Sequence, residues 1–109
     1  MKSKYNKVYI AGPMSGLPNF NIEAFDRAEK FIGERGDIAV NPAVRAKKWL
    51  EKNPDRKMTK GEYDQILLED LREIHKCDAI LMLPGWQNSN GAKAELSLAL
   101  IRKIPVEVM

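Results

Sequence analysis

The sequence predicts an α/β protein in which helices cover both faces of a parallel sheet of four to five short strands. Two observations support this fold class. Short apolar runs typical of buried strands alternate with longer segments whose apolar residues repeat at helical spacing. The resulting order, β-α-β-α-α-β-α-β, favours right-handed crossovers between parallel strands. The predicted architecture is a flavodoxin-like three-layer sandwich with strand order 2-1-3-4.

Two strands and two helices are expected in the first half of the chain. Lys7–Ala11 is a buried strand that ends in the loop Gly12-Pro13-Met14-Ser15-Gly16, whose glycines permit a tight turn and close approach to a ligand. Asn21 can cap the next helix. The apolar residues of that helix are Ile22, Phe25, Ala28, Phe31 and Ile32. Ile38–Val40 is the second strand, and Asn41-Pro42 begins a helix that runs to about residue 52.

The second half begins with a polar connection over residues 53–58. Thr59-Lys60-Gly61-Glu62 matches a capping box, so a third helix starts there and reaches about residue 76. Residues 79–83 form the clearest buried strand. A polar loop over 84–91 leads into a helix that ends near residue 102, and residues 105–108 form an edge strand with proline at its start.

Length and composition fit one soluble globular domain. The 109 residues suffice for one hydrophobic core and leave no room for a separate substrate domain, so residues 1–109 are expected to form a single domain. The net charge of +3 comes from scattered basic residues, so no nucleic-acid partner is expected. There is no apolar run of about 20 residues and no signal-peptide core. We expect a cytoplasmic protein without a membrane partner.

The sequence offers no recognisable set of metal ligands. The single cysteine, Cys77, cannot form an internal disulfide and is expected to pack as a small buried side chain. The single histidine, His75, falls near the end of a helix, where a surface position is expected. The carboxylates are scattered, so no metal and no cofactor are predicted.

Two loops are expected to meet at one crevice. The loops over 12–16 and 84–91 leave strands 1 and 3, which are neighbours in the predicted sheet, and ligands bind beyond the carboxyl ends of strands at such a point. The second loop also leads into a helix N-terminus, which attracts anions. The sequence therefore predicts a site for a nucleotide-like ligand.

Two carboxylates interrupt apolar helix faces near this crevice. Asp70 lies in the apolar stripe formed by Tyr63, Ile66, Leu67, Leu71 and Ile74, and Glu95 has mainly apolar helical neighbours. Each could be structural, bonded to nearby backbone. The helix N-terminus is expected to keep Glu95 ionised, as a nucleophile requires. Paired carboxylates in one crevice are typical of glycosidic cleavage through a covalent sugar intermediate.

Three further residues have two interpretations each. Tyr9 faces one side of the sheet near its carboxyl end, where it either packs in the core or contributes to the site. Asp78 opens the third strand and is expected to fix the preceding turn, with substrate contact as the alternative. Trp86 either stacks on a base or covers the sheet.

Several motifs together resemble the nucleoside 2-deoxyribosyltransferase superfamily. They are Tyr9-Ile10-Ala11-Gly12-Pro13, Asp70-Leu71 followed by Asp78, and Ser89-Asn90-Gly91 with Glu95. The short chain and its Ala-Gly-Pro-Met-Ser-Gly opening look like a small branch of phage and bacterial proteins (DUF4406-like). The resemblance implies the flavodoxin-like fold, a small-molecule nucleotide or nucleoside as partner, and no cofactor.

The resemblance also implies roles for matched residues. Glu95 stands where the family's nucleophile attacks the anomeric carbon, Asp70 where an acid helps protonate the leaving base, and Tyr9 where a tyrosine orients the nucleophile. Ser89 matches the phosphate-binding serine of deoxynucleoside 5′-monophosphate N-hydrolases, whereas the transferases often carry an aspartate there. We therefore expect cleavage of a (deoxy)nucleoside 5′-monophosphate. The alternatives are a nucleoside 2-deoxyribosyltransferase and a non-catalytic nucleotide-binding module.

The predicted site combines these roles with the two loops. The expected substrate-binding residues are Gly12, Pro13, Met14, Ser15, Gly16, Asn41, Asp78, Ser89, Asn90 and Gly91. The loop before Glu95 also echoes, at wider spacing, the Pro-Gly-Gly-x-Gly-Thr-x-x-Glu loop of cytokinin-activating phosphoribohydrolases. A homo-oligomer is expected, because the third and last helices carry apolar residues on more than one face.

Overall fold

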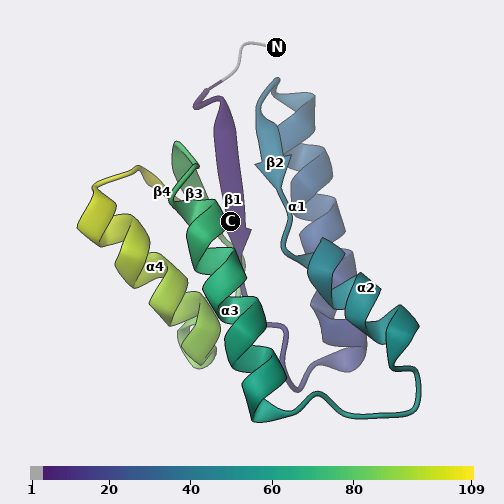
Figure 1. Ribbon diagram of the computed structural model, residues 1–109. Helices are drawn as coiled ribbons and strands as arrows, with labels where there is room; N and C mark the ends of the chain where they lie inside the picture. The colour runs from purple at the N-terminus through teal and green to yellow at the C-terminus, as the bar shows by residue number, and fades with distance from the viewer. Residues whose placement is uncertain (1–3) are drawn as a thin grey trace.

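A parallel β-sheet lies at the centre of the structure, a computed structural model that describes residues 4–109 (Figure 1). Over these residues the sheet has four strands in the order β2-β1-β3-β4, and the predicted order is confirmed. The strands are β1 (Lys7–Ala11), β2 (Ile38–Val40), β3 (Ala79–Met82) and β4 (Val106–Val108). The predicted α/β, flavodoxin-like class is also confirmed.

The two central strands end side by side. In the register of β1 and β3, Tyr9 pairs with Ile80 and Ala11 pairs with Met82. The ladder continues one residue further, since the N–H of Leu83 donates to the carbonyl of Ala11 at 2.8 Å. The loops that follow these strands therefore start from neighbouring points at the carboxyl edge of the sheet.

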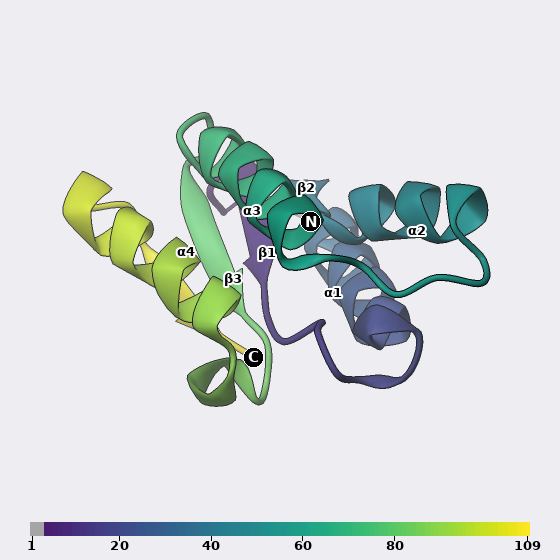
Figure 2. The same ribbon diagram turned by 60° about the horizontal axis from the view of Figure 1, so that its bottom comes forward.

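Helices pack on both faces of the sheet (Figures 1 and 2). One face carries α1 (Ile22–Glu34), and α2 (Ala43–Lys52) lies beside α1. The other face carries α3 (Lys60–Ile74) and α4 (Asn90–Arg102), which lie next to each other. Strand residues alternate between two apolar clusters. The α1 cluster includes Val8, Ile10, Phe25, Ile32 and Leu81, and the α3–α4 cluster includes Tyr9, Ala11, Ile74, Ile80, Met82 and Ala99.

Local signals for helix ends are mostly confirmed. The capping box of α3 is present: the N–H of Glu62 donates to Thr59 Oγ1 at 3.2 Å, and the N–H of Thr59 donates to Glu62 Oε1 at 3.0 Å. α2 begins at Ala43, just after the predicted Asn41-Pro42 start, and Asn41 Oδ1 accepts from the N–H of Ala43 at 2.9 Å.

Two expectations for α1 are wrong. Asn21 precedes the helix, but its side chain does not cap it; Asn21 Nδ2 instead donates to the carbonyl of Pro13 at 3.0 Å. The side chain thus ties the start of α1 to the loop after β1. Phe31 is 46% exposed rather than part of the core, and the Arg35 guanidinium lies 5.3 Å from the centre of its ring.

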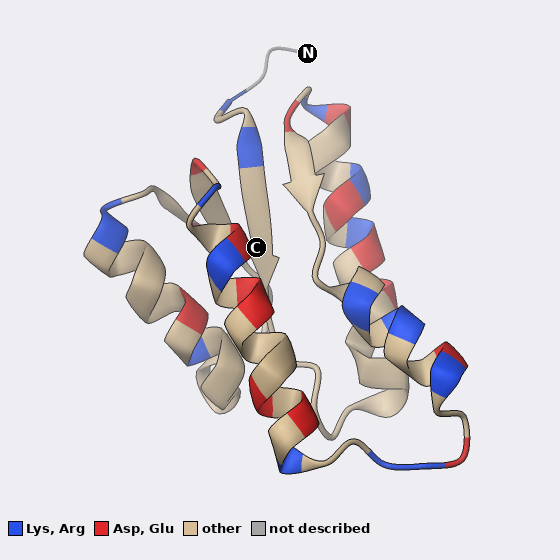
Figure 3. Cartoon of the chain, viewed as in Figure 1, with Lys and Arg blue, Asp and Glu red and all other residues tan. Residues whose placement is uncertain are grey.

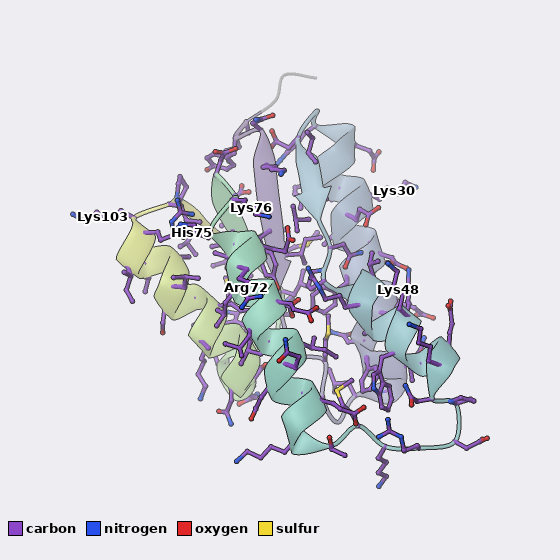
Figure 4. All side chains as sticks on the ribbon, viewed as in Figure 1. Lys30, Lys48, Arg72, His75, Lys76 and Lys103 are labelled. Atoms are coloured by element: carbon purple, nitrogen blue, oxygen red, sulfur yellow. The ribbon has the colours of Figure 1, made fainter. Side chains whose placement is uncertain are left out.

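The structure also places three of the side chains considered in the sequence. Cys77 is buried, as expected for a small apolar side chain, and His75 is exposed at the end of α3. Trp86 is half-buried and packs against the α3–α4 cluster, so it covers part of that core. In Figure 4, His75 and Lys76 project near the C-terminal end of α3.

Apolar side chains at the surface bear on self-association. Leu100 and Ile101 of α4 are 60% and 76% exposed, and Val108 of β4 is 68% exposed. The homo-oligomer stays a prediction. No helix formed by residues 4–109 has the length and apolar character needed to cross a lipid bilayer.

Candidate active site

The two predicted loops come together at the carboxyl edge of the sheet. A side chain at Gly12 would place its Cβ 2.8 Å from Leu83 Cβ, so glycine is needed where β1 ends against β3. Gly85 has a φ of +89°, and a Cβ built there would lie 3.3 Å from Pro13 Cγ. The loop after β1 therefore contacts the loop after β3, and both contribute to one cleft.

We call this the carboxylate cleft, because two acidic side chains, Asp70 and Glu95, line an otherwise mainly apolar surface. It is narrow, with a cavity volume of about 50 Å³, and it is partly open to solvent. It lies between the sheet edge, α2, α3 and the start of α4. Its lining includes Gly12, Met14, Ser15, Phe20, Ala46, Met58, Tyr63, Ile66, Leu67, Ser89, Gly91 and Ala92.

The apolar stripe of α3 explains why this cleft exists. Tyr63, Ile66 and Leu67 belong to this stripe, and they are only half-buried and face the cleft. A side chain at Gly91 would place its Cβ 2.6 Å from the Tyr63 hydroxyl, so glycine there leaves room for the Tyr63 ring beside the first turn of α4. The stripe therefore forms a wall of the cleft.

Glu95 lies on α4 and is only 5% exposed. Its Oε2 accepts a hydrogen bond from the hydroxyl of Tyr9, which is fully buried on β1. Burial raises the pKa of Glu95 to about 8, the Tyr9 hydrogen bond lowers it, and the charge of Asp70 raises it. Burial therefore opposes the expected effect of the helix N-terminus, and an ionised Glu95 stays a prediction.

Asp70 faces the cleft from α3 and is 7% exposed. Arg45 of α2 donates from Nη1 to Asp70 Oδ1 at 2.9 Å. Burial raises the pKa of Asp70 to about 7, although the charge of Arg45 and its hydrogen bond lower it. Asp70 is thus a carboxyl that exchanges a proton near neutral pH, held by a cation from a neighbouring helix.

Arg45 is a site residue that the sequence did not reveal. Besides Asp70, its guanidinium pairs with Glu69 at 3.1 Å and with Glu73 at 3.3 Å. These three acids lie within two turns of α3. A buried carboxylate on an apolar stripe signals that some cation is needed, but no local pattern identifies Arg45 as that cation.

Ser89 stands at the mouth of the cleft and caps α4. Its Oγ accepts from the N–H of Ala92 at 3.1 Å. A hydroxyl that accepts a hydrogen bond can still donate one, so Ser89 can cap the helix and also bind an anion. Ser15 of the facing loop lines the same cleft and is exposed.

The structure does not bring Asn41 and Asp78 to this cleft. Asn41 Nδ2 donates to Asp26 and Glu29 of α1, at 3.1 and 2.9 Å. Asp78 Oδ2 accepts from the N–H of Lys7 at 3.0 Å, at the amino ends of β1 and β3. Asp78 therefore fixes the turn before β3, at the edge of the sheet opposite the cleft.

The remaining predicted binding residues lie in or beside the carboxylate cleft. Gly12, Met14 and Gly91 line it, while Pro13, Gly16 and Asn90 line an adjoining cleft. Within residues 4–109, no group of three or more His, Cys, Asp and Glu side chains is arranged to hold a metal ion.

A family model matches the sequence over residues 6–108, and its description is "Domain of unknown function (DUF4406)". The chain belongs to the DUF4406 family. Comparison with curated proteins found no match. The matched range contains all four strands of the sheet, so both carboxyls and Tyr9 lie inside the DUF4406 domain.

Proposed function

We propose that this DUF4406 protein cleaves the N-glycosidic bond of a (deoxy)nucleoside 5′-monophosphate and releases the free base. The observation that carries the proposal is a pair of buried carboxyls, Asp70 and Glu95, that face one cleft from different helices. Glu95 is held by the Tyr9 hydroxyl and Asp70 by Arg45. The resemblance to nucleoside 2-deoxyribosyltransferases supplies the substrate class.

In the first step Glu95 acts as the nucleophile. One of its carboxylate oxygens forms a bond to C1′ of the sugar, and the bond from C1′ to the base nitrogen breaks with its electron pair going to the base. Asp70, in its protonated form, gives its proton to the base. The products of this step are a free base and a sugar phosphate esterified to Glu95.

In the second step water resolves the ester. The water oxygen bonds to C1′ while the bond between C1′ and the Glu95 oxygen breaks, and Asp70 accepts the proton that water releases. The sugar phosphate leaves, Glu95 is again a carboxylate, and Asp70 is again protonated. Tyr9 holds the Glu95 carboxylate in place through both steps.

The protonation states give this mechanism a defined pH dependence. Glu95, whose pKa is about 8, must be ionised, and Asp70, whose pKa is about 7, must be protonated. The active form carries a single proton, on Asp70, and it is most abundant between these values. Base release is expected to peak between about pH 7 and pH 8.

A 5′-phosphate suits the mouth of the cleft. Ser15 and Ser89 supply hydroxyl donors there, and α4 begins next to Ser89, so its N-terminus adds positive potential at the same place. The two acids of the lining, Asp70 and Glu95, are the groups assigned to the glycosidic bond. A phosphate bound at the mouth would leave the sugar to extend toward Glu95.

The experiment is a search for released base. The protein is incubated with a panel of nucleotides and nucleosides, and base is detected by chromatography. Wild-type protein should release base from at least one 5′-monophosphate, and Glu95→Gln should reduce the rate at least about 1,000-fold while nucleotide affinity stays within about tenfold. Glu51→Gln, the same change at an exposed residue, is the matched control. Nucleotide binding without base release from any member of the panel would refute the enzyme and favour a binding module.

A further inference from the structure

A second cleft adjoins the carboxylate cleft. It lies between the loop after β1, the end of α2, the connection from α2 to α3, and the turn before α4. Its lining includes Ser15, Gly16, Phe20, Trp49, Arg56, Lys57, Met58, Lys60, Tyr63, Ser89 and Asn90. We call it the cationic cleft, and Figure 3 shows the blue segment of the connection that forms one of its sides.

The two clefts differ in charge. The described residues that line the carboxylate cleft include Asp70 and Glu95 and no lysine or arginine. Those that line the cationic cleft include Arg56, Lys57 and Lys60 and no aspartate or glutamate. A ligand that spans both clefts would place its neutral N-glycosidic bond in the carboxylate cleft and its negative charge in the cationic cleft.

The clefts are continuous, because they share part of their lining. Ser15 and Ser89 belong to both, and so do Phe20, Met58 and Tyr63. The shared serines lie where the proposed function requires the 5′-phosphate. A chain of further phosphates leaving that point would enter the cationic cleft.

A network of side chains holds the connection between α2 and α3. Arg56 donates to both carboxylate oxygens of Glu62, each at 2.7 Å, and to Asn53 Oδ1 at 2.8 Å. Glu62 also accepts from Trp49 Nε1 at 3.1 Å. Glu62 offsets the charge of Arg56, so the excess positive charge of the cleft comes from Lys57 and Lys60.

The space available exceeds what one phosphate needs. The cationic cleft has a cavity volume of about 780 Å³, against about 50 Å³ for the carboxylate cleft. Lys57 and Lys60 are exposed, so both ammonium groups can reach a ligand from solvent without first breaking a buried contact. Lysine is a common partner of nucleotide phosphates.

We propose that the cationic cleft binds a polyphosphate, and that the preferred substrate is a (deoxy)nucleoside di- or triphosphate. This rests on the proposed function for the position of the sugar and base. The phosphate next to the sugar lies at Ser15 and Ser89, and the outer phosphates contact Lys57 and Lys60. The products would be a free base and a sugar 5-diphosphate or 5-triphosphate.

The test measures binding and turnover separately. Calorimetry with the Glu95→Gln variant compares the mono-, di- and triphosphates of the four common deoxynucleosides, without added divalent cations. We expect the triphosphate of at least one base to bind about tenfold or more tightly than its monophosphate. When Lys57→Gln and Lys60→Gln are added to the Glu95→Gln variant, the triphosphate should bind no more tightly than the monophosphate. The affinity for the monophosphate should stay within about threefold of that of the Glu95→Gln variant.

A matched control removes the same charge elsewhere. Lys48 and Lys76 are exposed residues of α2 and of the turn after α3, outside the linings of both clefts (Figure 4). Replacing both by glutamine should preserve the preference for triphosphate. Equal affinity for mono- and triphosphates, or equal loss in the control, would overturn the polyphosphate site.

Failure of this inference differs from failure of the proposed function. If base is released equally fast from mono- and triphosphates, and replacing Lys57 and Lys60 changes neither rate, the enzyme stands and the polyphosphate preference is wrong. If no nucleotide releases base, the proposed enzyme is wrong, while the calorimetry still decides whether Lys57 and Lys60 bind polyphosphate.

Discussion

Replacing Glu95 by glutamine should change how the stability of the fold depends on pH. In the folded protein burial raises the pKa of Glu95 to about 8, from an ordinary value of 4.5. Between these values the folded state keeps a proton that the unfolded state has released. The free energy of unfolding therefore falls as the pH rises through this window, because folding must hold the carboxyl in its protonated form.

The magnitude follows from the proton difference. One extra bound proton in the folded state lowers the free energy of unfolding by about 1.4 kcal/mol per pH unit. From pH 5 to pH 7 the contribution of Glu95 is a loss of about 3 kcal/mol. Asp70 adds a similar loss, since burial raises its pKa from 3.8 to about 7. Because Asp70 is present in both wild type and Glu95→Gln, its contribution cancels when the two proteins are compared.

Urea denaturation at several pH values between 5 and 7 measures this effect. The signal is the fluorescence of Trp49 and Trp86. The loss of stability over this range should be about 3 kcal/mol smaller in Glu95→Gln than in wild type. Glutamine keeps the shape of the carboxyl and can still accept from the Tyr9 hydroxyl, so packing is preserved. The Glu51→Gln control should follow the wild-type dependence.

One result would refute this reasoning. If wild type and Glu95→Gln lose stability in parallel between pH 5 and pH 7, Glu95 is ionised in the folded protein throughout that range. Its burial would then not raise its pKa, and the expected pH optimum would lose its basis.

Two further variants test the contacts around the site. Tyr9→Phe removes the hydrogen bond that lowers the pKa of Glu95. A hydrogen bond worth about 1.5–3 kcal/mol corresponds to a rise of roughly one to two pKa units. Base release at pH 7 should therefore fall roughly 10- to 100-fold, and the pH–rate profile should move to higher pH. An unchanged profile would exclude Tyr9 as the group that holds the nucleophile. Gly12→Ala should destabilise the fold by about 1–3 kcal/mol, because its Cβ would lie 2.8 Å from Leu83 Cβ. Gly33 lies on an open helical surface, so Gly33→Ala should instead leave stability unchanged or raise it by up to about 1 kcal/mol. Equal denaturation midpoints for Gly12→Ala and Gly33→Ala would contradict the close approach of Gly12 to Leu83.

The sheet could be predicted because its signals are local. The apolar runs of β1 and β3 are short and contiguous, and the alternation with helical segments leaves few topologies for a parallel sheet. The capping box at Thr59 and Glu62 is likewise contained in four consecutive residues. Patterns that repeat within a few residues therefore determined the elements and their order.

The side-chain partners that come from distant segments were not predictable. Arg45 and Asp70 lie on different helices, and only the packing of α2 near α3 brings them together. Asn21 is of a residue type that often caps helices, but its side chain instead donates to the carbonyl of Pro13, eight residues earlier. A residue type indicates that a side chain needs a partner, whereas the fold decides which partner is within reach.

Two features of the site could not be predicted because they depend on how far the side chains are buried. Helical spacing identified the apolar face of α3 but not that Tyr63, Ile66 and Leu67 face a cleft instead of the core. For Glu95 the effect of a helix N-terminus is about 1 kcal/mol, while burial of a carboxylate costs several kcal/mol. The sequence located Glu95 but could not rank these two effects, because burial is a property of the whole fold.

The central claim is that Glu95 bonds to the sugar during cleavage, and mass spectrometry of acid-quenched reactions tests it most directly. Wild-type protein mixed with a deoxynucleotide that releases base should gain the mass of the sugar phosphate, and peptide mapping should place that mass on Glu95. Glu95→Gln should show neither adduct nor base release. An adduct on another residue, or undiminished base release by Glu95→Gln, would contradict the account.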